Sequence, residues 1–300
     1  MPHPALRFAL RDAVSLASGA ANEDRIGFCD PFAWVIDGAT DLVDAPLGPG
    51  PTDAAWFAAA VDQHITGLAA GIARDKPGGS TLLDRLPESV ATATASEFAR
   101  RQKRPPAERW EYPSATLLAA ALDTTGALEV LSLGDCTLLI ARGRHVERLG
   151  ADAADVGDRA VAADVAALQR ARPMPQAAST IRPDLMPSLR ARRAHLNTET
   201  GYGVLSIVPP PPRFVERKRL ALKAGDFVLV ASDGLMRLVD VYRAHSAGSL
   251  MDAARSRGLA FLAMEARAIE EADATCSAYP RAKARDDASG LFLEIVAGAA

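Results

Sequence analysis

Short apolar runs separated by turn signals dominate the middle of the chain. Four of them follow closely: SATLLAAALD (114–123), ALEVLSL (127–133), CTLLIAR (136–142) and HVERL (145–149). Their separators are Thr125-Gly126, Gly134-Asp135 and Gly143, which are too short to contain a crossover helix. Strands joined by such turns pair as hairpins, so this block predicts an antiparallel sheet.

Further apolar patterns lie on both sides of this block. Thr52 and Asp53 are typical caps for a helix that follows them, and Pro105-Pro106 closes a second one. The pattern predicts strands over 5–18, 32–36, 219–223, 227–232 and 290–296, and helices over 54–73, 86–103, 235–245 and 249–272. Strands and helices are grouped rather than alternating, which favours an α+β fold with a sheet-rich core and helices outside it.

Residues 150–213 differ in character from their neighbours. They are rich in Ala, Arg and Pro, and they contain two expected helices around 158–171 and 184–194. The four prolines at 209–212 fit neither a helix nor a central strand. We interpret 150–213 as an insertion or lid on a single domain spanning 1–300, with a small subdomain as the alternative.

Charge and cysteine usage narrow the function classes. The 300 residues carry 34 Lys+Arg against 37 Asp+Glu, a net charge of −3, which favours neither nucleic acid nor an anionic membrane as a partner. No stretch approaches the roughly 18 apolar residues of a membrane span. Cys29, Cys136 and Cys276 are widely spaced without a CxxC pair, which argues against a disulfide framework. We therefore expect a soluble, cytoplasmic protein with reduced thiols.

Acidic residues stand at the ends of the apolar runs. They are Glu23-Asp24, Asp37-Gly38, Asp135, Asp233-Gly234 and Asp286-Asp287. One Asp-Gly pair alone is typical of a solvated turn. Several carboxylates at one end of a sheet repel each other unless a cation lies between them, and oxygen ligands suit Mg²⁺ or Mn²⁺. The five histidines form no HExxH zinc motif, so the pattern predicts a site for a hard divalent cation.

Six motifs occur in a specific order. They are NEDR at 22–25, WVIDGAT at 34–40, SATLLAAAL at 114–122, VLSLGDCTLLI at 130–140, DFVLVASDGLMRLV at 226–239 and RDDASGLFLEI at 285–295. This set, over about residues 5–297, resembles the metal-dependent protein phosphatase 2C family in its stand-alone bacterial form. The resemblance implies two antiparallel β-sheets packed as a central sandwich flanked by α-helices (αββα). It also implies two Mg²⁺ or Mn²⁺ ions at one edge, with a third in some members.

The resemblance also assigns roles to the acids. Asp37 resembles the aspartate that bridges both ions, and the Gly38 carbonyl resembles a ligand of one of them. Asp233 and Asp286 resemble the remaining direct ligands. Asp37 and Asp233 are therefore the residues on which catalysis is expected to depend most.

Three further acids resemble family residues that are not direct ligands of the two main ions. Glu23 and Asp24 resemble acids that hold metal-bound waters or a second ion, and Asp135 resembles the ligand of a third, weaker ion. Asp287 stands where asparagine is also common, so Asp286 is the expected ligand of that pair.

The activity implied is hydrolysis of phosphoserine or phosphothreonine on a phosphorylated protein, through water held between two ions. A non-catalytic relative that binds a phosphorylated partner or senses a ligand is the second hypothesis. A phosphatase of small metabolites is the third. Regulation would come through the lid or a separate regulatory protein.

Some residues depart from the family pattern. Gly19 stands where many members have a phosphate-binding arginine, and Ala39 where eukaryotic members have a histidine proposed as general acid. Cys136 replaces the usual serine, and we expect a small buried side chain there. The arginines considered as substitutes for the missing phosphate ligand are Arg25, Arg190, Arg192 and Arg193.

Overall fold

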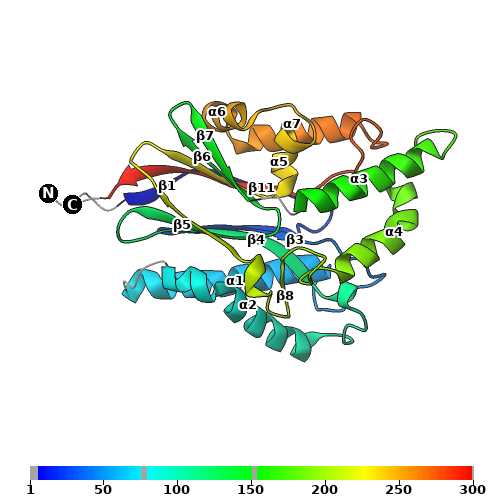
Figure 1. The fold of residues 1–300 in the computed structure, drawn as a ribbon, viewed down its shortest axis with the longest axis horizontal. Helices are drawn as coiled ribbons and strands as arrows, with labels where there is room; N and C mark the ends of the chain where they lie inside the picture. Colours follow the sequence, from blue (N-terminus) through cyan, green and yellow to red (C-terminus); the bar gives the residue numbers. More distant parts are fainter. Residues whose placement is uncertain (1–5, 76–79, 151–153, 299–300) are drawn as a thin grey trace.

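The computed structural model describes residues 6–75, 80–150 and 154–298. Two antiparallel sheets lie face to face, and helices cover the outer side of each (Figure 1). This is the expected α+β sandwich. Residue 5 of the first predicted strand and residues 151–153 of the predicted insertion lie outside the described residues.

The first sheet joins the two ends of the chain. Its strand order is β1-β11-β10-β6-β7, and β1 pairs antiparallel with β11 from Leu6↔Ala297 to Leu16↔Ala288. The strands are β1 (Leu6–Leu16), β11 (Ala288–Ala297), β10 (Phe227–Ala231), β6 (Thr137–Arg142) and β7 (His145–Leu149).

The second sheet has the order β2-β3-β4-β5-β9, and a short β8 pairs with β4. The strands are β2 (Asp24–Cys29), β3 (Phe32–Gly38), β4 (Ser114–Leu122), β5 (Ala127–Leu133), β9 (Glu216–Ala221) and β8 (Leu205–Ser206). The sequence pattern did not predict β2, because Gly27 interrupts its apolar run. A Cβ at Gly27 would lie 2.0 Å from the Trp34 ring, so only glycine lets this ring cross the strand.

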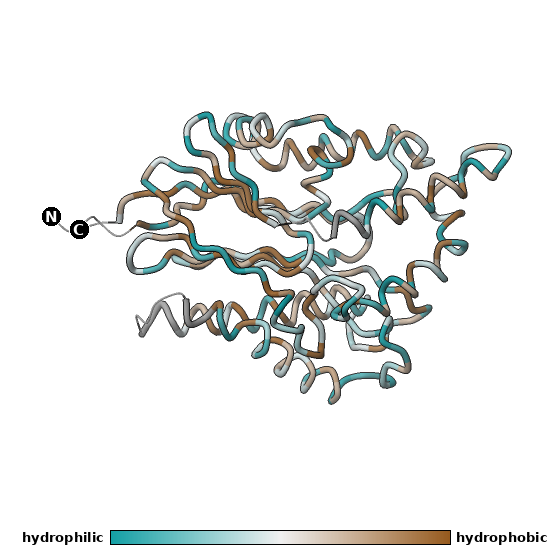
Figure 2. Tube along the Cα trace, in the orientation of Figure 1, coloured by the Kyte–Doolittle hydropathy of each residue, from teal (hydrophilic) through white to brown (hydrophobic). Residues whose placement is uncertain are grey.

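Three apolar layers hold the sandwich together. The layer between the sheets includes five fully buried side chains, Val35, Leu118, Ile140, Val230 and Leu293. It follows the facing strands as the brown segments in Figure 2. A second layer lies between the second sheet and α1 (Asp53–Asp75) and α2 (Ser80–Arg101), and a third lies between the first sheet and α5 (Asp233–Asp240), α6 (Ala247–Arg257) and α7 (Leu259–Ala272).

Several helix boundaries differ from the prediction. The helix expected over 249–272 is two helices, because Gly258 has a φ of +87°, which favours glycine and ends α6. The Asp12 carboxylate accepts the Leu259 N–H (2.7 Å) at the start of α7. Helix α2 begins at Ser80 and contains Pro87, and α5 ends at Asp240 rather than at residue 245.

Two helices extend beyond the end of the sandwich. They are α3 (Ala154–Arg170) and α4 (Ala178–Ala194), and they form a hairpin at the end opposite the start of β1 (Figure 1). Val165, Ile181 and Leu185 form a small apolar core of their own between them. Helix α4 begins six residues earlier than the expected 184 and includes Pro183 and Pro187. Short 3-10 helices lie at Arg109–Glu111 (η1) and Pro212–Phe214 (η2).

The helices were also compared with the length and apolarity that a membrane span requires. Within the described parts of the chain, none of them is both long and apolar enough to cross a bilayer.

Candidate functional site

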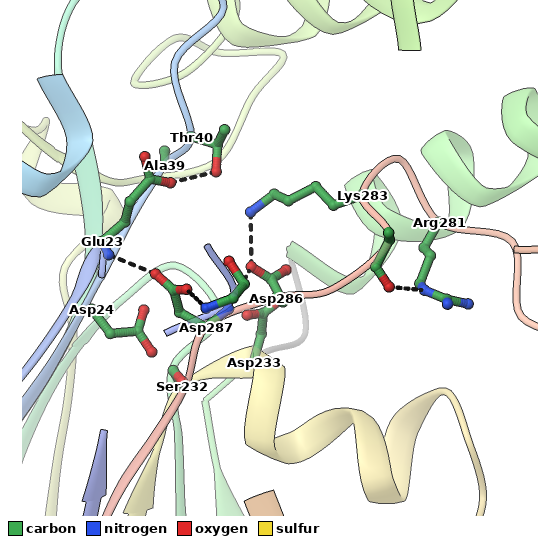
Figure 3. Close-up of polar contacts among 12 residues, drawn as sticks. Glu23, Asp24, Ala39, Thr40, Ser232, Asp233, Arg281, Lys283, Asp286 and Asp287 are labelled. Carbon is green, nitrogen blue, oxygen red and sulfur yellow. Dashed lines mark hydrogen bonds and ion pairs between the residues drawn. The ribbon is translucent and has the colours of Figure 1, made fainter. Parts of the chain in front are cut away.

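Acidic residues from both sheets meet at one end of the sandwich. Asp24 begins β2 and Asp37 lies near the end of β3, where the two are direct cross-strand partners. Asp135 lies in the β5–β6 turn, Asp233 begins α5 after β10, and Asp286 lies just before β11. Figure 3 shows the side chains of Asp24, Asp233 and Asp286 converging. The structure thus brings together the acids that the sequence places at strand ends.

Asp37 lies at the electrostatic centre of this group. Burial, together with the charges of Asp24, Asp233, Asp135 and Asp286, raises the pKa of Asp37 well above 3.8. Four other carboxylates therefore act on this one group. In a metal-free site such a cluster retains protons, whereas a bound cation would let the acids ionise.

Asp24 is the most enclosed of the acids. It is 1% exposed, and neither of its carboxylate oxygens has a hydrogen-bond partner among the described residues. Ser232 and Ser289 lie beside it, but the Ser232 hydroxyl is bonded to the Ser289 backbone and the Ser289 hydroxyl to Ser15. Burial raises the pKa of Asp24 well above its usual value. Buried polar atoms are almost always satisfied, so these two oxygens fit a cation.

A second acidic group lies on the side of the site facing the α3–α4 hairpin. Carboxylate oxygens of Asp135, Asp158 and Asp233 lie within 4.8 Å of one another. Burial and the charges of Asp233 and Asp158 raise the pKa of Asp135 to about 7. Asp158 lies on α3 and no strand-end pattern points to it, so the sequence reasoning missed it.

Asp286 has a different environment, because two cationic side chains contact it. Lys283 Nζ lies 2.8 Å from Oδ1 and Arg237 Nη2 lies 2.6 Å from Oδ2 (Figure 3 for Lys283). Arg237 also lies 3.6 Å from Asp233 Oδ2. Although burial opposes it, the charges of Lys283 and Arg237 lower the pKa of Asp286 to about 2. The sequence analysis singled out neither cation.

Asp287 and Glu23 are engaged in hydrogen bonds that shape the site. The Asp287 carboxylate accepts the backbone N–H groups of Ser18 and Glu23, both at 2.5 Å. The Glu23 carboxylate accepts the Thr40 hydroxyl at 2.6 Å. Asp287 therefore ties the β1–β2 connection to the start of β11.

Both glycines that follow the site aspartates are required by close packing. A Cβ on Gly38 would lie 2.6 Å from the Glu23 carbonyl oxygen, and one on Gly234 would lie 1.9 Å from the Asp287 carbonyl oxygen. Gly234 thereby lets the start of α5 approach the Asp286-Asp287 backbone. This adds a steric reason for the two Asp-Gly pairs to the expected role of the glycine carbonyl toward a metal.

The arginines considered as phosphate ligands have other partners. Arg25 donates to the carbonyls of Asn22 and Asp24, at 2.8 and 2.6 Å, and Arg192 pairs with Asp164 at 2.9 Å. Arg190 donates to the Leu42 carbonyl (2.8 Å), and Arg193 to those of Ala39 and Thr40. Arg190 and Arg193 thereby hold α4 against the loop that follows Asp37-Gly38.

Arg182, another arginine of α4, contacts the loop that follows Asp37-Gly38. It donates to the Asp41 carbonyl at 3.3 Å. Burial lowers its pKa, while the charges of Glu23 and Asp286 oppose this effect, so both carboxylates lie within electrostatic reach. The late predicted start of α4, at 184, left Arg182 outside the expected helix.

The remaining departures from the family pattern have simple structural settings. Gly19 is exposed on the β1–β2 connection, and the Ala39 N–H donates to the Ser114 carbonyl at 2.9 Å. Cys136 is 0% exposed and lies 3.2 Å from the Thr116 hydroxyl, which confirms the expected small buried side chain.

Comparisons with solved structures identify similar folds. The serine/threonine phosphatase PstP/Ppp of Mycobacterium tuberculosis is similar over 97% of this chain and 99% of that one, with a TM-score of 0.55 and 17% identity. The catalytic domain of PstP in complex with two manganese ions gives 0.51 at 18% identity, over 97% and 98% of the two chains.

The phosphatase domain and part of the regulatory domain of SpoIIE from Bacillus subtilis give a TM-score of 0.50 at 14% identity, covering 98% of this chain and 65% of that one. At these identities the likeness concerns the fold. No curated protein sequence matches the chain.

The sequence itself matches one family description. The model of protein phosphatase 2C matches residues 13–260, which contain most of both sheets and the site acids up to Asp233. The chain therefore belongs to the protein phosphatase 2C family.

Proposed function

We propose that the protein is a divalent-cation-dependent phosphatase that hydrolyses phosphoserine or phosphothreonine on proteins. The observation that carries the proposal concerns Asp24 and Asp37. The buried oxygens of Asp24 have no hydrogen-bond partner within the described ranges, and the neighbouring Asp37 carboxylate is surrounded by four others. Such a site fits Mg²⁺ or Mn²⁺, which prefer oxygen ligands. The Mn²⁺-bound neighbour of similar fold supports the same chemistry.

Bound divalent ions would supply an activated water and positive charge against the phosphoryl oxygens. We infer that Asp37 and Asp24 would hold a divalent ion, with Gly38 contributing its carbonyl. Asp233 and Asp286 would hold them from the other sheet. Glu23 would orient water, and Asp135 with Asp158 would form an additional position.

Arg182 is the residue that we propose for binding the substrate phosphate. It lies on α4 beside the Asp41 carbonyl, where the charges of Glu23 and Asp286 act on it, and a guanidinium matches the geometry of phosphate oxygens. In this role it would replace the phosphate-binding arginine that many family members have at the position of Gly19. The α3–α4 hairpin would then act as a lid that carries part of the substrate site.

The experiment is hydrolysis of p-nitrophenyl phosphate with Mn²⁺, with and without a chelator. Asp37→Asn and Asp233→Asn should abolish turnover, while Asp252→Asn, an exposed acid on α6, should retain it. A panel of phosphoserine, phosphothreonine and small phosphorylated metabolites then separates protein from metabolite substrates. A folded wild-type protein without activity under any divalent ion would contradict the proposal.

A second candidate function is favoured by one observation. Asp286 is already neutralised by Lys283 and Arg237, as expected of a relative that binds a phosphorylated partner without hydrolysing it. Binding of a phosphopeptide without phosphate release would support this alternative.

The three free cysteines suit a reducing compartment, so for either function we propose a cytoplasmic location.

A further inference from the structure

The negative charge of Asp286 is balanced by two cationic side chains of the protein itself. Lys283 Nζ and Arg237 Nη2 contact the two oxygens of Asp286, at 2.8 and 2.6 Å. The Asp286 side chain is only 9% exposed, so these two cations rather than solvent are its main partners. In contrast, neither oxygen of Asp24 has a hydrogen-bond partner in the described parts of the chain. The two sides of the acidic site are therefore unequal before any ion binds.

The loop that carries Lys283 is held firmly in place. Arg281, 5% exposed, pairs with Asp273 at 2.6 Å and donates to the Ala284 carbonyl at 3.1 Å (Figure 3 for Arg281). From the other side, Arg267 donates to the Asp286 carbonyl at 3.0 Å. The direction of Lys283 toward the acids thus follows from a fixed backbone.

The two cations differ in their freedom to leave. Arg237 lies on α5, and its side chain is 14% exposed between Asp233 and Asp286. The Lys283 side chain is 31% exposed, and an ammonium on a flexible stem makes a point contact rather than a fixed fork. Lys283 can therefore move into solvent more readily than Arg237.

We propose that Lys283 is a built-in counter-ion that a divalent cation must displace to bind at Asp286. This inference rests on the proposed function, because it concerns the same cation site. Its consequence is that the Asp24–Asp37 side binds a divalent ion more tightly than the Asp286 side does. Lys283 thereby sets the cation concentration at which the site becomes fully loaded.

Calorimetric titration of Mn²⁺ into chelator-treated protein tests the proposal. Lys283→Met should bind Mn²⁺ at the weaker position about tenfold or more tighter than wild type, since a repelling charge is removed at close range. The matched control is Lys218→Met, because Lys218 is an exposed lysine on β9, and it should bind as wild type does.

A second measurement needs no variant. Acetylation of wild-type lysines, read by peptide mass spectrometry, should show Lys283 reacting severalfold faster with Mn²⁺ than without it, while Lys218 is unchanged. This result decides the matter if Lys283→Met does not fold.

The possible results separate the two proposals. Equal Mn²⁺ affinities for wild type and Lys283→Met, with unchanged acetylation of Lys283, would overturn the role of Lys283 and leave the cation site intact. No Mn²⁺ binding to any of the three folded proteins, by contrast, would overturn both the proposed function and this inference.

Discussion

Asp24 and Asp37 face each other as direct partners across the β2–β3 ladder, with Asp24 almost fully buried. Two carboxylates at such a cross-strand position repel each other and destabilise a sheet. Here Asp24 in addition has no hydrogen-bond partner among the described residues. The metal-free sheet edge therefore carries a free-energy cost, which the cation of the proposed function would offset.

That cost predicts the effect of Asp24→Asn. The substitution keeps the shape and removes an ionisable group whose charged form is disfavoured by burial, so the metal-free variant should be more stable than wild type at pH 8, by about 1–3 kcal/mol. Chemical denaturation measures this difference. Mn²⁺ should stabilise the variant less than wild type, and Asp252→Asn should change stability by less than about 0.5 kcal/mol. A metal-free Asp24→Asn that is less stable than wild type would contradict this reading of the site.

Asp41 predicts a pH dependence of stability. Its carboxylate accepts the N–H groups of Asp53 (2.7 Å) and Ala54 (3.0 Å) at the start of α1, yet burial raises its pKa from 3.8 to about 6. The folded state then binds the proton more tightly than the unfolded state, so the contribution of Asp41 to stability falls as pH rises from about 4 to about 6.

Asp41→Asn should remove this slope. The measurement is the free energy of unfolding of both proteins between pH 4 and about 7.5. Other acids of the site affect both proteins equally, so the difference between wild type and variant isolates Asp41. As the pH rises through this interval, the free energy of unfolding of wild type should fall relative to that of Asp41→Asn. A constant difference would show that Asp41 titrates as an ordinary carboxyl.

Arg182→Ala should raise KM for a phenyl phosphate substrate by about tenfold or more, because a hydrogen bond to a charged group is lost. Arg182→Lys should recover part of the loss, since it keeps the charge without the bidentate fork. Arg192→Ala is the matched control, because Arg192 lies on the same helix and pairs with Asp164 instead. An unchanged KM in a folded Arg182→Ala protein would remove Arg182 from the phosphate site.

Gly234→Ala should disturb the backbone that supports the acidic site. Its Cβ would lie 1.9 Å from the Asp287 carbonyl oxygen, so the start of α5 and the Asp286-Asp287 backbone must separate. We expect a loss of about 1–3 kcal/mol of stability, together with weaker Mn²⁺ binding. Gly67→Ala, in an open position of α1, should instead stabilise by about 1 kcal/mol. Thermal unfolding of both variants compares them, and a neutral Gly234→Ala would show that α5 moves freely.

The fold was largely predictable from local patterns. The hairpin strands from 114 to 149 follow from apolar runs and glycine turns, and both the sandwich and the protein phosphatase 2C family that the motifs resembled are confirmed. Strand β2 was missed because Gly27 is explained only by the Trp34 ring that covers it. The break at Gly258 was missed because a positive φ leaves no trace in hydrophobic periodicity.

The site was predictable only in its acids. Asp24, Asp37, Asp135, Asp233 and Asp286 mark strand ends, which a linear pattern reveals. The charges that modulate them come from helices and loops with other periodicities: Asp158 from α3, Arg182 from α4, Arg237 from α5 and Lys283 from the loop before β11. Their proximity is a tertiary property, and the spacing of residues along the chain does not encode it directly. The assignment of metal ligands therefore stays a prediction.

Release of inorganic phosphate from a phosphothreonine peptide, as Mn²⁺ is titrated into chelator-treated protein, tests the central claim most directly. We predict no release without the ion, a rise that saturates with Mn²⁺ in wild type, and no release at any Mn²⁺ concentration in folded Asp37→Asn. Phosphate release that persists in the chelator, or that Asp37→Asn retains, would contradict the account of the acidic site.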